Sequence, residues 1–129
     1  INCRWGMRGI ISECHFDAGE NFVLMLKGMK RYVLSAPSTC KHLGVLTDRT
    51  HPSARHSILD WSDKQQVRSS DFHKVPAIDT IVHTGEVLFI PSMWFHFIVA
   101  LNYNVQCNTR NGHPPAEKTE EMLDKVCQP

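Results

Sequence analysis

The sequence predicts an all-β fold, either a sandwich or a barrel, followed by one helix at the C-terminus. Short apolar runs recur about every 8–12 residues in the second half of the chain, with turn residues between them. The first half holds two further apolar runs of strand length. After Pro114 the composition becomes charged, and apolar residues recur at helical spacing. The first two observations favour β-strands for the body of the chain, and the third favours a helix at its end.

The first half contains three predicted extended segments. Residues 5–12 read as extended, and a glycine within them indicates a bulge or a close backbone approach. Residues 21–26 form a continuous apolar run that Gly28 breaks, and residues 30–34 resume with alternating polarity. Two runs separated by one glycine predict an antiparallel hairpin, which would bring Lys30 back toward the residues before it.

Residues 38–75 lack a sustained strand pattern and are predicted to be an insertion between two sheet-forming halves. Within it we expect one helical turn at 38–43, a brief strand or turn at 58–61, and a short helix within 63–72 behind an Asp or Ser cap. The insertion and its flank also hold histidines that we expect to be solvated loop residues: His42, His51, His56 and His73.

Strand patterns return after the insertion. The predicted strands are residues 77–83, 87–90, 94–101 and 103–109, separated by turn or stop residues at Gly85, Pro91 and Asn102. Beyond them, Met122, Leu123 and Val126 recur at helical spacing and predict an amphipathic helix packed on the outside. We therefore divide the chain into a β core at residues 1–112 and a helical segment at residues 113–129.

Length and charge restrict the function. At 129 residues the chain is one domain or part of one, and its 42% apolar fraction suffices for a core. The net charge is +1 and the charges are dispersed, so no electrostatic footprint for nucleic acid or a membrane stands out. No apolar run approaches the ~18 residues that span a bilayer. Because Ile1 already stands in a predicted strand, we expect a fragment that lacks N-terminal strands.

The five cysteines are odd in number and show no C-x-x-C spacing. This pattern argues against a zinc site and against a disulfide framework. We therefore expect reduced core thiols in a cytoplasmic or nuclear protein. Cys14 adjoins a candidate metal ligand, but its predicted role is packing.

A His-x-Asp pair is the first candidate site. Side chains alternate along a strand, so His15 and Asp17 point to the same face. An imidazole beside a carboxylate supplies two ligands for a first-row metal, and His96 is the natural candidate for a third. Two histidines and one carboxylate on one face of an octahedron suit non-haem Fe(II) oxygenases. The alternative is that His15 caps a turn and Asp17 begins a loop.

Three sequence blocks carry a family resemblance. In order they are G-x-I-S-x-x-H-F-D-x-x-x-N-F, K-G-x-K-R-Y-x-L-x-x-P and G-E-V-L-F-I-P-S-M-W-F-H. Together they resemble the JmjC and cupin-like family of Fe(II)- and 2-oxoglutarate-dependent oxygenases, and its hydroxylase-like branch in particular, over residues 8–112. The resemblance implies a double-stranded β-helix, a jelly roll whose eight core strands form two sheets with the metal between them.

The resemblance also implies roles for individual residues. The iron ligands would be His15, Asp17 and His96. Lys30 would bind the far carboxylate of 2-oxoglutarate with a charged hydrogen bond, and Ser12 would hydrogen-bond the same group. Two asparagines near the cosubstrate complete the implied set: Asn21 and Asn108.

Some positions are open to a second interpretation. Lys30 can equally be a surface strand lysine beside Arg31. Arg110 stands where the family's hydroxylases carry a tryptophan, and there it either contacts a carboxylate or faces the substrate. Phe16 and Trp94 flank the ligands and are candidate walls of the substrate pocket, or else sheet core. The family's upstream cosubstrate tyrosine precedes the first residue of this chain.

The implied function is a dioxygenase that hydroxylates, or N-demethylates, a macromolecule with Fe(II), 2-oxoglutarate and O₂, releasing succinate. A protein or peptide is the expected substrate and RNA the alternative, with no membrane partner. Two other functions stay open: a non-catalytic cupin-fold binding module, and a metal-dependent cupin that does not use 2-oxoglutarate. The sequence does not choose between hydroxylation and demethylation, nor does it give the oligomeric state.

Overall fold

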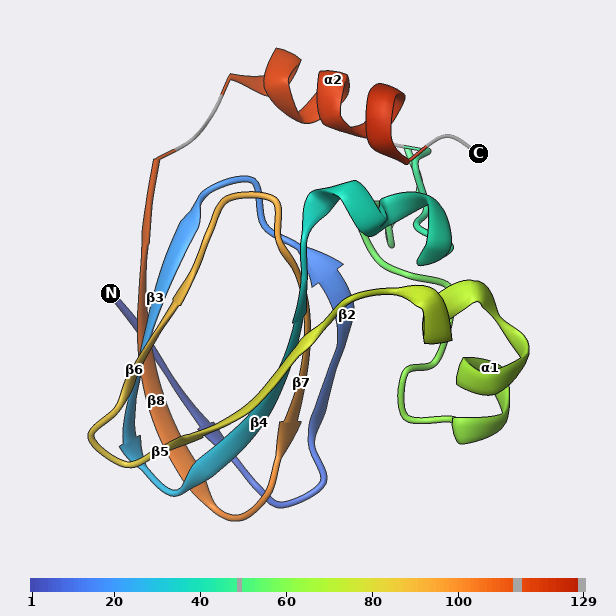
Figure 1. Cartoon of the computed structure of the whole chain (residues 1–129). Coiled ribbons are helices and arrows are strands. Elements are labelled where there is room, and N and C mark those ends of the chain that lie inside the picture. The colour runs from blue at the N-terminus through green and yellow to red at the C-terminus, as the bar shows by residue number, and fades with distance from the viewer. Residues whose placement is uncertain (49, 113–114, 128–129) are drawn as a thin grey trace.

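Eight strands form two four-stranded antiparallel sheets in the computed structural model, which describes residues 1–48, 50–112 and 115–127 (Figure 1). The strands are β1 Asn2–Gly6, β2 Ile11–Phe16, β3 Glu20–Lys27, β4 Met29–Ser35, β5 Ile78–His83, β6 Val87–Ile90, β7 Phe95–Ala100 and β8 Asn104–Asn111. Sheet A has the order β1-β8-β3-β6, and sheet B has the order β2-β7-β4-β5. Successive strands change sheet at every step except β4 to β5. This winding is the predicted jelly roll.

The predicted hairpin of residues 21–26 with residues 30–34 is wrong. β3 pairs with β6 and β8 in sheet A, whereas β4 pairs with β5 and β7 in sheet B. Gly28, at a φ of 77°, forms the corner between the sheets, and a Cβ there would lie 2.3 Å from the carbonyl oxygen of Tyr103. Only glycine fits this corner, and it directs the chain across to the other sheet rather than back along β3.

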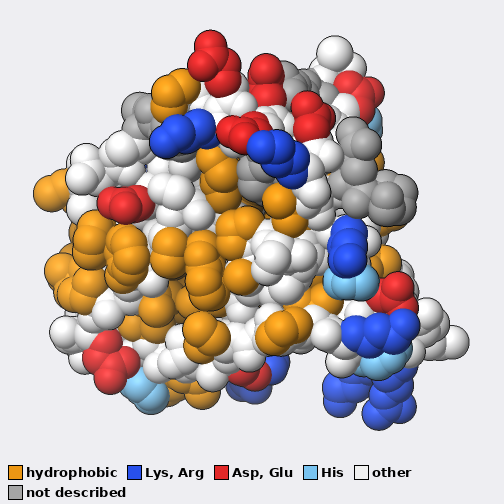
Figure 2. Space-filling view, turned by 45° about the horizontal axis from the view of Figure 1, so that its top comes forward, with side chains coloured by type: hydrophobic (Ala, Val, Ile, Leu, Met, Phe, Trp, Pro, Cys, Tyr) orange, Lys and Arg blue, Asp and Glu red, His pale blue; other side chains and the backbone are white. Residues whose placement is uncertain are grey.

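The space between the sheets holds one of two hydrophobic clusters. Alternate residues of the strands point into it, and its buried members are Val23, Met25, Tyr32, Leu34, Val82 and Ile90. The opposite face of sheet A is also apolar but exposed, with Phe22, Leu24 and Phe89 among its side chains. Figure 2 shows this hydrophobic surface on the side where sheet A lies in Figure 1.

The second cluster lies on the outer face of sheet B. It joins outward-pointing strand residues to the insertion and to the C-terminal helix, with Phe16, Phe95 and Phe97 among its buried members. Figure 1 shows the insertion beside sheet B, to the right. The insertion therefore packs on one sheet instead of adding strands to the sandwich.

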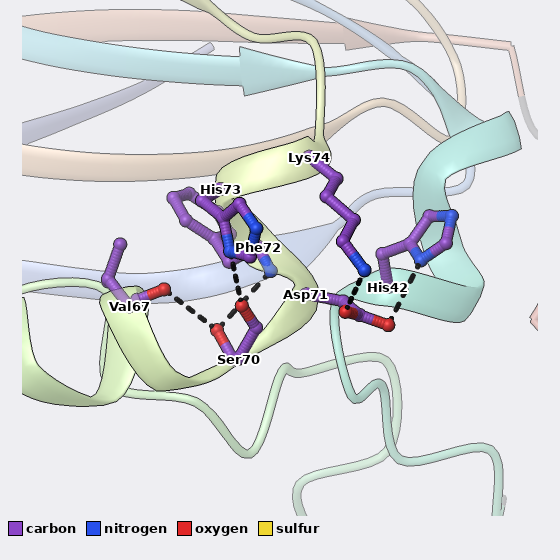
Figure 3. Close-up of polar contacts among 7 residues, drawn as sticks. All are labelled: His42, Val67, Ser70, Asp71, Phe72, His73 and Lys74. Carbon is purple, nitrogen blue, oxygen red and sulfur yellow. Dashed lines mark hydrogen bonds and ion pairs between the residues drawn. The ribbon is translucent and has the colours of Figure 1, made fainter.

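Short helices give the insertion its shape: η1 Pro37–His42, α1 Lys64–Ser69 and η2 Asp71–Lys74. Asp63 caps α1, accepting hydrogen bonds from the backbone N–H groups of Gln65 and Gln66. Ser70 caps η2 in the same way. Figure 3 shows Asp71 between His42 and Lys74, with its nearest carboxylate oxygens 3.8 Å and 2.8 Å from their nitrogens.

The prediction of reduced core thiols is wrong for four of the five cysteines. Cys3 of β1 is bonded to Cys107, its direct partner on β8, and Cys40 of η1 is bonded to Cys127. Both pairs are distant in sequence, so an odd count without close spacing concealed them. Cys14 stays free and buried, and burial raises the pKa of its thiol. The reduced-thiol premise for a cytoplasmic or nuclear location therefore does not hold.

The C-terminal helix α2, Ala116–Val126, lies across one end of the sandwich (Figure 1). Leu123 is buried in the cluster outside sheet B, and the Cys40–Cys127 bond ties the end of the helix to η1. Among the described residues, no helix has the length and apolar character needed to cross a bilayer.

Candidate metal centre

The His-x-Asp pair and the remote histidine meet between the sheets. His15 on β2 and His96 on β7 are direct cross-strand partners, and each of the two offers a ring nitrogen within 4.8 Å of the other and of an Asp17 oxygen. The β2–β7 register shifts between Ser12 and His15. This bulge breaks the simple alternation of the strand, so Ser12 and His15, three residues apart, both face the space between the sheets.

Backbone hydrogen bonds orient both imidazoles. His15 Nδ1 lies 2.7 Å from the carbonyl oxygen of Glu13, and His96 Nδ1 lies 3.0 Å from that of Trp94. A carbonyl only accepts, so each Nδ1 carries the proton, and each Nε2 keeps its lone pair for a metal. Trp94 thus contributes its carbonyl to the site, while its side chain packs against the cluster between the sheets.

Asp17 presents a buried acceptor without a hydrogen bond. Its Oδ2 lies 3.8 Å from His96 Nε2 and has no hydrogen-bond donor among the described residues. Arg110 Nη2 approaches it at 3.1 Å as an ion pair, but not in hydrogen-bonding geometry. A buried carboxylate oxygen that accepts no hydrogen bond, beside two imidazole lone pairs, fits a divalent cation, since such an acceptor is otherwise costly.

Burial keeps the two histidines neutral. Loss of solvent lowers the pKa of His96 to about 4, with a further contribution from the neighbouring His15. The pKa of His15 is also lowered, chiefly by burial. Metal ligation requires unprotonated imidazole, so the site is ready to bind a metal at neutral pH without losing a proton from either ring.

The cavity beside the triad contains three of the predicted cosubstrate residues. Ser12, Asn21 and Asn108 all line it, and Asn108 donates from Nδ2 to Asn21 Oδ1 at 3.3 Å. Both asparagines are buried, and Asn108 Oδ1 has no hydrogen-bond partner within residues 1–48, 50–112 and 115–127. The cavity is narrow, with a volume of about 40 Å³.

Lys30 does not line this cavity itself, but it belongs to a polar group with three residues that do: Arg4, Tyr32 and Gln106. Its Nζ donates to Gln106 Oε1 at 2.6 Å, and the Tyr32 hydroxyl donates to the same oxygen at 3.0 Å. Arg4 lines the cavity directly opposite Gln106 in the β1–β8 register. Burial, with a smaller contribution from the charge of Arg4, lowers the pKa of Lys30. No acidic side chain among the described residues pairs with either cation, so the group can accept an anion.

Sequence reasoning missed three residues of this group: Arg4, Tyr32 and Gln106. Tyr32 shares the inward face with Lys30, two residues away on β4, and that alternation was a usable signal. Arg4 and Gln106 meet Lys30 only through pairing between distant strands, which no local pattern reveals.

Two other predicted placements need correction. Phe16 is fully buried in the cluster outside sheet B, because strand alternation turns it away from the metal ligands. It therefore does not wall a substrate pocket. His56, predicted as a solvated loop residue, instead stacks on His15 with ring centroids 5.0 Å apart and lies half-buried. An isolated antiparallel bridge between the insertion and β2 pairs His56 with His15, and the sequence did not indicate this bridge.

Comparison with known proteins agrees with this fold. The model of the cupin-like domain matches residues 1–109. A tRNA wybutosine-synthesizing protein 5 from Danio rerio is 30% identical over 107 residues, covering 83% of this chain and 31% of the relative. A lysine-specific demethylase 8 from Xenopus tropicalis is 31% identical over 108 residues, covering 79% and 23%. A JmjC domain-containing protein D from Dictyostelium discoideum is 26% identical over 108 residues, covering 79% and 22%.

The chain spans less than a third of the length of each of these relatives. The matched region covers 79–83% of this chain, whose jelly roll places two histidines and an aspartate between its sheets. With the domain match over most of its length, the chain belongs to the JmjC and cupin-like domain family.

Proposed function

We propose that this chain is the metal- and cosubstrate-binding core of an Fe(II)- and 2-oxoglutarate-dependent oxygenase. One observation carries the proposal. The cavity that holds two available imidazole nitrogens and a carboxylate is also lined by Arg4 and by Gln106, to which Lys30 donates. Neither Arg4 nor Lys30 has an acidic partner among the described residues. A metal chelator with a second, distant carboxylate fits both features at once.

Three protein ligands leave half of an octahedral coordination sphere open, which is the arrangement of non-haem iron oxygenases. When bound, iron with 2-oxoglutarate and dioxygen supplies oxidation of an unactivated C–H bond, with decarboxylation of the keto acid to succinate. His15, Asp17 and His96 would hold the metal. Lys30 would bind the distal carboxylate through a charged hydrogen bond and so orient the chelating end.

A macromolecular substrate is supported by the relatives, which are named for tRNA wybutosine synthesis and for lysine demethylation. We propose a protein or peptide substrate, with RNA as the alternative. Hydroxylation and N-demethylation begin with the same oxidation of a C–H bond. They differ in the atom to which the oxidised carbon is bonded. When that atom is nitrogen, the hydroxylated product breaks down and the methyl group is lost.

The test is succinate release by the purified chain with Fe(II), ascorbate and 2-oxoglutarate. We expect slow turnover without substrate, lost in His96→Ala and kept in the matched control His51→Ala, whose imidazole is exposed in the insertion. Metal binding without succinate release would instead indicate a cupin that does not use 2-oxoglutarate. Absence of both would indicate a non-catalytic binding module and overturn the proposal.

A further inference from the structure

A second cavity, of about 430 Å³, lies on the outer face of sheet B beneath the insertion. Its floor includes Val33 of β4 and Phe97 of β7, and the insertion supplies Trp61 and Phe72 as walls. Because Phe97 and His96 are adjacent on β7, they point to opposite faces of the sheet. This cavity is therefore separate from the metal centre, and its volume is that of a small-molecule site.

Trp61, which lines this cavity, carries a buried indole donor. The residue is 9% exposed, and its indole Nε1 is buried without a hydrogen-bond partner among the described residues. Phe72 and Phe97 hold the ring, with centroids 4.4 Å and 6.0 Å away. A buried indole N–H ordinarily finds an acceptor, so a donor without one in the described part of the chain leaves this role open to a ligand.

Two cations stand at the rim. Lys64 and Arg68 lie one helical turn apart on α1, both line the cavity, and both are exposed. Neither forms an ion pair among the residues that the structure describes. The neighbouring acids are already engaged, since Asp63 caps α1 and Asp60 accepts from Ser62. Figure 2 shows basic and histidine side chains gathered at the lower right, where the insertion lies in Figure 1.

We propose that this cavity binds a small organic acid with an aromatic body, whose acidic group is a carboxylate or a phosphate. The acidic group is held between Lys64 and Arg68, where paired cations give charge-assisted hydrogen bonds. The body packs on Phe72 and Phe97, and an acceptor on it meets the Trp61 N–H. The site is independent of the proposed oxygenase reaction, because it occupies the opposite face of sheet B.

The probes are indole-3-acetate and phenyl phosphate, which carry the two acidic groups on aromatic bodies. Inorganic phosphate lacks the body and indole lacks the acid. Binding to the complete chain is measured by calorimetry and by the indole N–H resonance of Trp61 in ¹H–¹⁵N spectra. We expect one or both aromatic acids to bind at least tenfold tighter than phosphate or indole, and to shift that resonance. The tighter of the two acids identifies the acidic group.

Variants separate the contributions. Lys64→Ala with Arg68→Ala should weaken binding at least tenfold, whereas Arg8→Ala with Lys118→Ala removes the same charge from exposed positions elsewhere and should change nothing. Trp61→Phe retains an aromatic wall but loses the donor, and should weaken binding several-fold. Because Lys64 and Arg68 are exposed, their removal leaves the fold intact. An unmoved Trp61 resonance, or wild-type affinity in the double variant, would overturn the proposal.

Discussion

His15 and His96 are direct partners across the β2–β7 ladder, although one comes from the start of the chain and the other from its last third. Their ring centroids are 4.3 Å apart. The spacing of the two proposed metal ligands is therefore a consequence of strand register. A slip of one residue would turn one imidazole to the opposite face and abolish the centre.

The carboxylate ligand provides the first prediction. Asp17→Ala should weaken binding of Fe(II), or of Mn(II) as an air-stable substitute, by at least about 100-fold, because one of three protein ligands is lost. Calorimetry on the purified chain measures this. Asp79→Ala is the matched control, since that carboxylate pairs with Arg31 on the outside of sheet B. Equal losses in both variants would mean that Asp17 has no special relation to the metal.

Lys30 should affect the cosubstrate rather than the metal. In Lys30→Ala we expect the 2-oxoglutarate concentration for half-maximal succinate release to rise by about 10–100-fold, as for loss of a charge-assisted hydrogen bond, with Mn(II) affinity kept. Lys27→Ala is the control, because Lys27 is exposed and lies 5.4 Å from the Tyr103 ring centroid. An unchanged 2-oxoglutarate requirement in Lys30→Ala would mean that Lys30 does not bind the cosubstrate and has a structural role.

Arg4 should contribute to the same anion site. Arg4→Ala removes the cation that faces Gln106 across β1 and β8, so the 2-oxoglutarate requirement should rise several-fold. The exposed Arg8 gives a control for general charge, through Arg8→Ala. A matching rise in both variants would show that only net charge matters.

The buried histidines predict a loss of stability in mild acid for the metal-free chain. The pKa of His96 is about 4 when folded against 6.5 as its ordinary value. Between these values the unfolded chain binds a proton that the folded chain does not, so stability is full above pH 6.5 and falls as the pH drops toward 4. The free energy of unfolding, measured with denaturant, should fall by about 2 kcal/mol from pH 7 to pH 5.

Substitution identifies the source of this loss. His96→Gln should flatten the pH dependence over the same range, because no depressed imidazole remains at that position. His51→Gln removes an exposed histidine and should leave the slope as it was. A slope that survives in His96→Gln at full strength would contradict the assignment.

Alanine substitutions at Gly28 and Gly85 distinguish the energetic cost of steric crowding from that of backbone strain. Both glycines have positive φ, 77° and 88°, but a Cβ on Gly28 would meet the Tyr103 carbonyl oxygen, whereas nothing lies within 4 Å of one on Gly85. Gly85→Ala should cost about 1–2 kcal/mol of unfolding free energy from strain alone. Gly28→Ala should cost about 2–5 kcal/mol, since crowding adds to it. Thermal or denaturant unfolding measures both losses. Equal losses of unfolding free energy in the two variants would show that crowding at Gly28 adds no cost.

Local patterns predicted the strands after the insertion well, whereas the extended segment predicted at residues 5–12 spans the end of β1, a turn and the start of β2. The run at residues 87–90 is β6, and the segments at 77–83 and 94–101 differ from β5 and β7 by one residue at one end or both. Alternation also placed His15 and Asp17 toward the same space. These features depend on residues close in sequence, for which apolar periodicity and turn residues are sufficient.

The relations that failed are long-range. Gly28 looks like a hairpin turn in sequence, and only the crowding from Tyr103 makes it a corner between sheets. Cys3 and Cys107 pair because β1 lies on β8, and the pairing of Lys30 with Gln106 likewise depends on how distant strands are arranged. Such neighbours are set by topology, which spacing along the chain does not encode.

The small volume of the cavity beside the triad has a kinetic consequence. About 40 Å³ holds roughly three water molecules, less than a five-carbon keto diacid occupies. Gln106 and Arg110 are among the residues that line this space, and we expect side chains of the lining to shift when the proposed cosubstrate enters. Uptake is then gated by side-chain rearrangement, so the observed association rate should level off at high ligand concentration instead of rising in proportion to it.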